Sequence, residues 1–309
     1  MLKMRTPTDE VIEQVLSVYK SWGRTTTAKQ MRDGWDALFS KNDDYLSADY
    51  TEIEGVRVAW IGDVNLPRDR IFIYLHGGGY QVGSIRSHYE MVSRISAKSK
   101  IIGLAIAYSR APEHSFPTPV MECVKVYKSL LRQGVKAKNI AFIGDSAGAN
   151  LAISTVLMLT DKGLPYPAML ALMSPWTDLE ARGKSYETRS KLDPIHQRGM
   201  ILRMAEIYLA GHDPKDPLAS PLNADLNEFP PTLIQVGDRE TVLDDARDFA
   251  QKLELAGIEV DCQVWDGMIH VFQQFPDILP EADQALAKIS DFLISHLTSK
   301  VSNHKIEVK

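Results

Sequence analysis

The segment that decides the fold is Gly144-Asp145-Ser146-Ala147-Gly148, which lies between an apolar run at residues 140–143 and a helical pattern at residues 150–159. A Gly-x-Ser-x-Gly sequence between a strand and a helix is typical of a tight turn that presents the serine hydroxyl at the end of a sheet. Such a turn strains the backbone at Ser146, and glycine at 144 and 148 removes side chains that would collide with the strand and the helix. Ser146 is therefore the candidate nucleophile.

Short apolar segments and helical patterns alternate outward from this turn. The expected strands are residues 50–53, Val56–Ile61, Ile71–Leu75, 101–107, 140–143, Met169–Met173, 232–236 and Val260–Trp265. The expected helices are residues 88–97, 120–131, 150–159, 242–255 and 281–297. This alternation predicts an α/β fold with a doubly wound, mostly parallel central sheet flanked by helices. The length of 309 residues would suit two domains, but one large α/β domain fits equally well.

Two segments do not follow the alternation. In the first, residues 1–45, Thr6 and Pro7 predict the start of one helix, and a second helix is expected at residues 31–39. The second segment belongs to a stretch between residues 165 and 231 that holds nine of the 16 prolines and an expected helix at 197–208. An insertion of this size is usually functional. The residues alone favour simple packing on the core over a lid for the N-terminal helices.

A glycine triplet forms the second motif. His76-Gly77-Gly78-Gly79 follows the apolar strand Ile71–Leu75 directly. Glycines let backbone N–H groups point into a site without side chains in the way. Those of Gly78 and Gly79, with the N–H of Ala147 at a helix start, could hold the negative oxygen of a tetrahedral intermediate. No Gly-Lys-Ser/Thr follows the triplet, which excludes a P-loop.

A serine nucleophile needs a histidine base and an acid that orients it. Of the eight histidines, His270 follows the last expected strand and precedes the last expected helix, where the order nucleophile, acid, base requires it. The acid should come from the turn after strand 232–236, and Asp244 and Asp245 there are expected in the first turn of the next helix. Glu240 is favoured over Asp238 because its side chain is longer, whereas an aspartate beside a glycine suits a turn.

Composition excludes several other classes of function. The 35 Lys and Arg against 40 Asp and Glu give a net charge of −5 without a basic block, which argues against nucleic acid as a partner. No apolar run reaches the length of about 18 residues that a membrane span requires, and the first residues lack the apolar core of a signal peptide. The two cysteines, Cys123 and Cys262, suit a reducing compartment. We therefore expect a cytoplasmic protein.

The motifs resemble those of the bacterial hormone-sensitive-lipase family of α/β-hydrolase esterases. The resemblance rests on segments at residues 76–80 (HGGGY), 108–114 (YSRAPEH), 116–117 (FP), 144–148 (GDSAG), 174–179 (SPWTDL) and 267–272 (GMIHVF). Two segments depart from the family pattern. Tyr-Ser-Arg-Ala-Pro-Glu replaces the usual Tyr-Arg-Leu-Ala-Pro-Glu, which puts the local structural arginine in doubt. Gly-Asp-Arg-Glu at 237–240 replaces the Asp-Pro-Leu acid motif and resembles a subgroup with a glutamate acid, which supports Glu240 and leaves Asp238 second.

The resemblance implies a domain plan and an activity. A catalytic core at residues 46–300 would lie under a helical cap formed by residues 1–45 and about 181–215, with a flexible tail at 301–309. The expected activity is hydrolysis of short- to medium-chain acyl esters through a serine acyl-enzyme. Its triad would be Ser146, Glu240 and His270, and its oxyanion hole Gly78, Gly79 and Ala147. No metal or organic cofactor is required, and a small-molecule ester is the expected partner.

Three further expectations concern alternative activities and the assembly. An amidase, a lactonase or an acyltransferase would use the same triad. A ligand receptor on the same fold is disfavoured because the related receptors lose the histidine that His270 supplies here. Related enzymes often dimerise through an edge strand near the C-terminal end of the sheet, here Val260–Trp265, so a homodimer is also expected.

Overall fold

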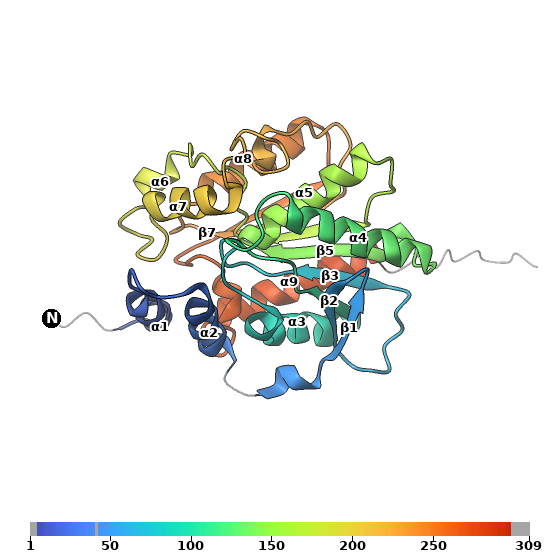
Figure 1. Ribbon diagram of the computed structural model, residues 1–309, viewed down its shortest axis with the longest axis horizontal. Helices are drawn as coiled ribbons and strands as arrows, with labels where there is room; N and C mark the ends of the chain where they lie inside the picture. The colour runs from blue at the N-terminus through green and yellow to red at the C-terminus, as the bar shows by residue number, and fades with distance from the viewer. Residues whose placement is uncertain (1–4, 41–42, 298–309) are drawn as a thin grey trace, which may run out of the picture.

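An eight-stranded sheet runs through the centre of the molecule in this computed structural model, which describes residues 5–40 and 43–297 (Figure 1). The strand order is β1-β2-β4-β3-β5-β6-β7-β8. The strands are β1 (Asp49–Ile53), β2 (Val56–Ile61), β3 (Ile71–Leu75), β4 (Ile102–Ile106), β5 (Ile140–Asp145), β6 (Met169–Met173), β7 (Thr232–Gly237) and β8 (Val260–Trp265). Strands β3 to β8 pair in parallel, and β1 and β2 add an antiparallel edge. The predicted α/β fold with a mostly parallel sheet is confirmed.

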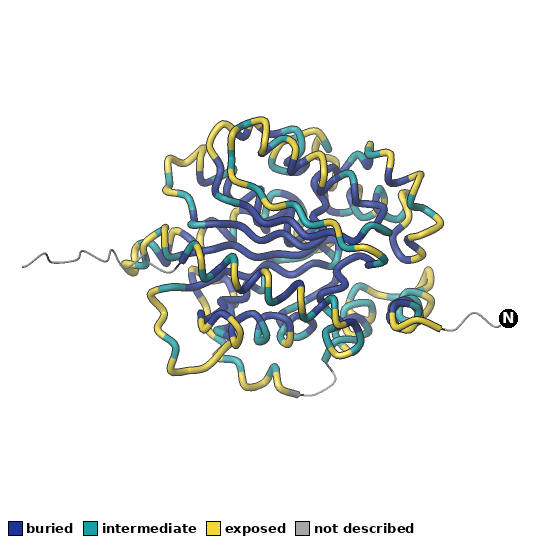
Figure 2. Tube along the Cα trace, turned by 180° about the vertical axis from the view of Figure 1, so that it is seen from behind, coloured by how far each residue is buried: buried dark blue, intermediate teal, exposed yellow. Residues whose placement is uncertain are grey.

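Helices cover both faces of the sheet, and a hydrophobic core lies on each face. Successive residues of a strand point alternately into one core and into the other. In β3, Ile71 and Ile73 belong to the core beneath α4 (Thr118–Arg132), α5 (Ala147–Asp161) and α8 (Leu243–Leu255). Phe72 and Tyr74 belong to the opposite core, beneath α3 (Ile85–Ser99) and α9 (Pro280–Leu297). Because both faces are covered, the central strands are buried throughout, as Figure 2 shows.

The remaining helices lie at one end of the molecule, on either side of the sheet (Figure 1). They are α1 (Pro7–Ser21), α2 (Ala28–Phe39), α6 (Ser185–Thr188) and α7 (Arg198–Leu209). Helix α1 begins as expected, with a capping box between Thr6 and Asp9. Helix α2 begins three residues earlier than expected, because the Thr27 side chain accepts a hydrogen bond from the Gln30 N–H and caps an additional turn.

Short 3₁₀ helices and the chain ends complete the description. The 3₁₀ helices are η1 (Asp43–Ser47), η2 (Ala137–Asn139), η3 (Pro221–Asn223) and η4 (Phe272–Gln274). The predicted tail at 301–309 lies outside the described residues. Over the described part of the chain, no helix is both long enough and apolar enough to cross a membrane.

Candidate active site

The predicted nucleophile lies in a strained turn between β5 and α5. Ser146 has φ 52° and ψ −118°, a conformation that non-glycine residues rarely adopt. A Cβ atom on Gly144 would lie 2.5 Å from the carbonyl oxygen of Gly148, and one on Gly148 would meet the backbone of β3. Both glycines are therefore required for this close approach of strand and helix.

A continuous series of hydrogen bonds joins Ser146, His270 and Glu240, which approach from three different parts of the chain. His270 Nε2 lies 2.9 Å from Ser146 Oγ, and His270 Nδ1 lies 2.8 Å from Glu240 Oε2. The competing candidate, Asp238, instead accepts a hydrogen bond from the Gly267 N–H at 2.7 Å. The carboxylate that contacts the imidazole is thus that of Glu240.

Two further donors fix the Glu240 carboxylate, which is fully buried. Its Oε1 accepts hydrogen bonds from Ser174 Oγ at 2.8 Å and from the Gly237 N–H. The Ser174 hydroxyl oxygen in turn accepts from the Val271 N–H at 3.0 Å, next to His270. Ser174 therefore connects the acid with the histidine loop. Sequence reasoning missed this contact, although Ser174 begins one of the segments that carry the family resemblance.

The electrostatic environment of His270 favours its protonated form. Burial alone lowers the pKa of this imidazole, but the hydrogen bond to Glu240 and the negative charges of Glu240, Asp193 and Asp145 more than offset it. The pKa of His270 consequently lies above its usual value. A base with this bias accepts a proton readily from a neighbouring hydroxyl.

The predicted oxyanion donors lie next to Ser146. Gly78 and Gly79 line the cavity beside the serine, with φ values of 109° and 59°. Ala147 is the first residue of α5 and is buried, and it is not among the residues that line the cavity. Within the described residues, no acceptor takes the backbone N–H groups of these three residues. Unused N–H groups beside a hydroxyl are suited to holding a negative oxygen.

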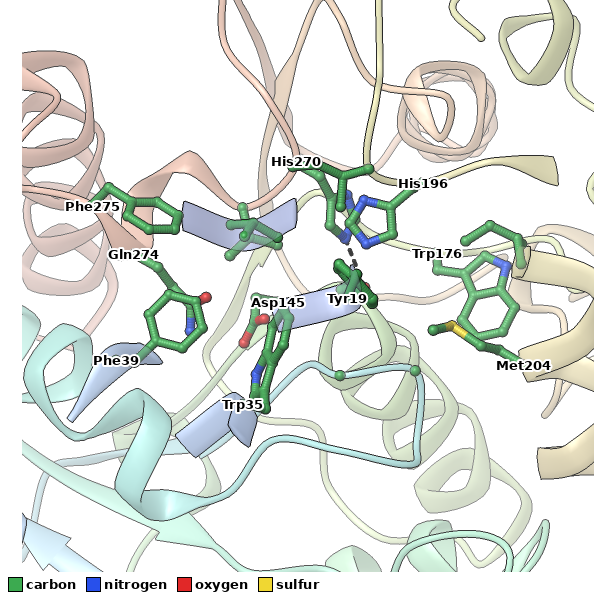
Figure 3. A pocket seen from close by; sticks show the side chains of 17 residues that line it. Tyr19, Trp35, Phe39, Asp145, Trp176, His196, Met204, His270, Gln274 and Phe275 are labelled. Atoms are coloured by element: carbon green, nitrogen blue, oxygen red, sulfur yellow. Dashed lines mark hydrogen bonds between the residues drawn. The ribbon is translucent and has the colours of Figure 1, made fainter. Parts of the chain in front are cut away.

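A small cavity of about 40 Å³ opens beside Ser146. Figure 3 shows the side chains that line it. Most of its lining is apolar or aromatic, and eight of the lining residues come from the ranges 1–45 and 181–215. These are Val15, Tyr19, Trp35, Phe39, Ile195, His196, Ile201 and Met204. The other lining residues are Gly78, Gly79, Asp145, Ser146, Trp176, His270, Val271, Gln274 and Phe275. Such a lining suits apolar groups of a small ligand.

Two buried residues near this cavity have no sequence signal. His196 lies against His270, with 4.2 Å between ring centroids, and Asp193 is buried three residues before it. Both belong to the proline-rich insertion, in which no motif marks them.

Arg110, the arginine of segment 108–114 that departs from the family pattern, makes a contact within the structure. Arg110 donates to the Gly83 carbonyl, while Glu113 forms a salt bridge with Arg32 of α2 at 2.6 Å. An arginine from outside the segment thus contacts its glutamate.

Comparison with known proteins gives concordant results. A family model described as the alpha/beta hydrolase fold matches residues 72–274. An acetyl-hydrolase from Streptomyces hygroscopicus is 42% identical over 224 residues, covering 72% of this chain and 75% of that protein. An esterase from Acinetobacter venetianus is 37% identical, covering 73% and 75%. The crystal structure of an esterase from the bacterial hormone-sensitive lipase family is 38% identical, with a TM-score of 0.90 over 96% of this chain and 100% of that one.

Proposed function

This chain belongs to the α/β-hydrolase fold family, among the esterases of the bacterial hormone-sensitive-lipase type, and from that premise we propose that Ser146, His270 and Glu240 are the catalytic triad with which it hydrolyses carboxylic esters. The observation that carries the proposal is the hydrogen-bonded series from Ser146 Oγ through His270 to the buried Glu240 carboxylate. At its Ser146 end, the series opens into the cavity, next to the unused backbone N–H groups of Gly78 and Gly79.

The first half of the reaction forms an acyl-enzyme. Ser146 Oγ attacks the ester carbonyl carbon while His270 Nε2 takes the hydroxyl proton. The carbonyl oxygen becomes negative, and the N–H groups of Gly78, Gly79 and Ala147 stabilise it. Collapse of this intermediate breaks the bond to the alcohol oxygen, which receives the proton from His270.

The second half releases the acid. Water donates a proton to His270 Nε2 as its oxygen attacks the acyl carbonyl. The second tetrahedral intermediate then collapses, its bond to Ser146 Oγ breaks, and His270 returns the proton to Ser146 Oγ as the carboxylic acid leaves. Throughout, Glu240 accepts the Nδ1–H of His270, which holds the ring in the tautomer that leaves Nε2 free. The negative charge of Glu240 also stabilises the imidazolium.

The cavity supports a proposal about the substrate class. The described residues of the segments 1–45 and about 181–215 act as a two-part cap over the core, and their apolar side chains exclude water from the reacting carbonyl. The apolar lining of the cavity supports acyl groups of short to medium chain length as part of this proposal. Two relatives have names consistent with this choice, the acetyl-hydrolase above and an ethyl acetate hydrolase from Pseudomonas putida, 28% identical over 233 residues.

The deciding experiment is Ser146→Ala, assayed on p-nitrophenyl esters of increasing acyl length and paired with fluorophosphonate labelling. We expect hydrolysis to fall by at least about 10⁴-fold and labelling to disappear, since the nucleophile is lost. The exposed Ser295→Ala in α9 is the matched control and should leave both unchanged. Full hydrolysis by Ser146→Ala would contradict the proposal.

The assembly stays a prediction. Strand β8 lies at one edge of the sheet, as a dimer contact through Val260–Trp265 requires. Light scattering on the purified protein tests whether it is a homodimer.

A further inference from the structure

A histidine outside the triad lies directly against the ring of His270. The centroids of His196 and His270 are 4.2 Å apart, with 55° between the ring planes (Figure 3). His196 is itself buried, and Tyr19 of α1 lies edge-on to it at 6.2 Å. Its Nδ1 has no hydrogen-bond partner among the described residues, the nearest carboxylate oxygen being Asp193 Oδ1 at 4.0 Å. His196 therefore contacts His270 through its ring rather than through a hydrogen bond.

Asp193 fixes the segment that carries this ring. Its Oδ1 accepts hydrogen bonds from the N–H groups of Ile195 at 3.1 Å and His196 at 2.9 Å. Its Oδ2 accepts from the Thr241 N–H at 3.0 Å, and the Thr241 hydroxyl donates to the His196 carbonyl at 2.9 Å. Thr241 is the residue after Glu240. Asp193 thus joins the insertion to the loop that supplies the triad acid.

The surroundings of the two rings shift their pKa values in opposite directions. Burial, followed by repulsion from a charged His270, keeps the pKa of His196 well below its usual value, so this ring is neutral. The groups that act electrostatically on His270 are Glu240, Asp193 and Asp145, all carboxylates. Tyr19 is a neutral phenol, because burial raises its pKa. Of the three carboxylates that act on His270, Asp193 is the one that belongs to the insertion.

We propose that His196 and Asp193 are positioning residues for His270. His196 is a neutral ring that holds the orientation of the imidazole and keeps water from it, and Asp193 fixes that ring and Thr241 beside Glu240. The proposal rests on the proposed function, because it assigns a consequence to the base role of His270.

The test is the pH profile of kcat and KM for p-nitrophenyl acetate in His196→Ala, His196→Phe and the wild type. In His196→Ala, water reaches the imidazole and the ring loses a contact. We expect kcat to fall about 10- to 100-fold with a smaller change in KM, since slight misplacement of a catalytic group can cost about 100-fold. The acid limb should move to higher pH, because the imidazolium is better hydrated.

His196→Phe keeps a neutral ring without nitrogen atoms. It should restore most of the lost kcat and return the acid limb toward the wild-type position. Arg203→Ala, an exposed position on α7, is the matched control within the same insertion. If His196→Phe is as damaging as His196→Ala, the ring nitrogens act on the substrate and the proposal is wrong. Wild-type kinetics in His196→Ala would also overturn it.

Asp193→Asn tests the second residue through a shift in the opposite direction. Loss of the carboxylate charge should move the acid limb to lower pH. Should this variant fail to fold in a thermal melt, Thr241→Val removes only the hydroxyl bonds to Asp193 and His196, and should lower kcat. No shift in a folded Asp193→Asn, or unchanged kcat in Thr241→Val, would exclude the link. These failures differ from failure of the proposed function, in which the wild type is inactive or Ser146→Ala is active.

Discussion

Replacing Glu240 by glutamine tests the choice of triad acid most directly. The carboxylate accepts from His270 on one oxygen and from Ser174 and Gly237 on the other. A glutamine has one oxygen and one NH₂ group. If the NH₂ faces His270, Nδ1 must become the acceptor, and the proton moves to Nε2, which can no longer accept from the nucleophile. If the NH₂ faces Gly237, two donors meet in a buried site.

The size of the effect follows from these two alternatives. The wrong tautomer lowers kcat by about 10⁴-fold where it has been measured in a triad of this kind. At 1.36 kcal/mol for each factor of ten, this is about 5.4 kcal/mol of transition-state free energy. Asp238→Asn retains an oxygen that can accept from the Gly267 N–H. It therefore loses at most the charge assistance of one hydrogen bond, about 1 kcal/mol, or less than about tenfold in rate.

The assay compares kcat/KM of the two variants on p-nitrophenyl butyrate, at a pH above the acid limb of each. A thermal melt shows whether either variant is unfolded. An active Glu240→Gln beside an inactive, folded Asp238→Asn would transfer the acid role to Asp238. A loss of less than tenfold in both would refute the reasoning about the tautomer altogether.

Two further predictions follow from the pKa of His270 and from the contacts of α2. The kcat/KM of the wild type should fall as pH decreases through a midpoint above about 6.5. The raised pKa of His270 makes imidazolium persist to higher pH, and imidazolium cannot act as a base. A profile of rate against pH that stays flat through this range would contradict this prediction. Arg32→Ala removes hydrogen bonds from α2 to the carbonyls of Gln81 and Ala111 and to Glu113, whose pKa Arg32 lowers to about 2. We expect a loss of about 1–3 kcal/mol in unfolding free energy and a raised KM, measured by denaturant titration and ester kinetics, with the exposed Lys29→Ala as control.

The elements that could be predicted are those in which backbone geometry restricts the residue type. The turn at Ser146 tolerates only glycine at 144 and 148, so its residue pattern is enough to identify it. The central strands are equally plain, because a parallel strand covered on both faces must be apolar along its whole length. These two constraints determine the fold class and the position of the proposed nucleophile.

The choice between Glu240 and Asp238 needed coordinates, since two carboxylates two residues apart satisfy the same sequence order. The strand β7 ends at Gly237, and the chain then turns so that Asp238 faces the Gly267 N–H while Glu240 returns toward His270. Side-chain length favoured Glu240 but could not give the direction of either side chain. That direction depends on the β8–α9 connection, 30 residues further along.

The contacts of His196 and Asp193 lie beyond sequence reasoning for a different reason. Neither residue occupies a strained turn or a strand end, so no local rule fixes its type. Their importance comes from the meeting of three segments, the insertion, the loop after β7 and helix α1. Because Asp193 bonds to Thr241 beside the acid, the insertion cannot move from the core without disturbing Glu240. Under the proposal made above, the segment that shapes the cavity therefore also helps to orient His270.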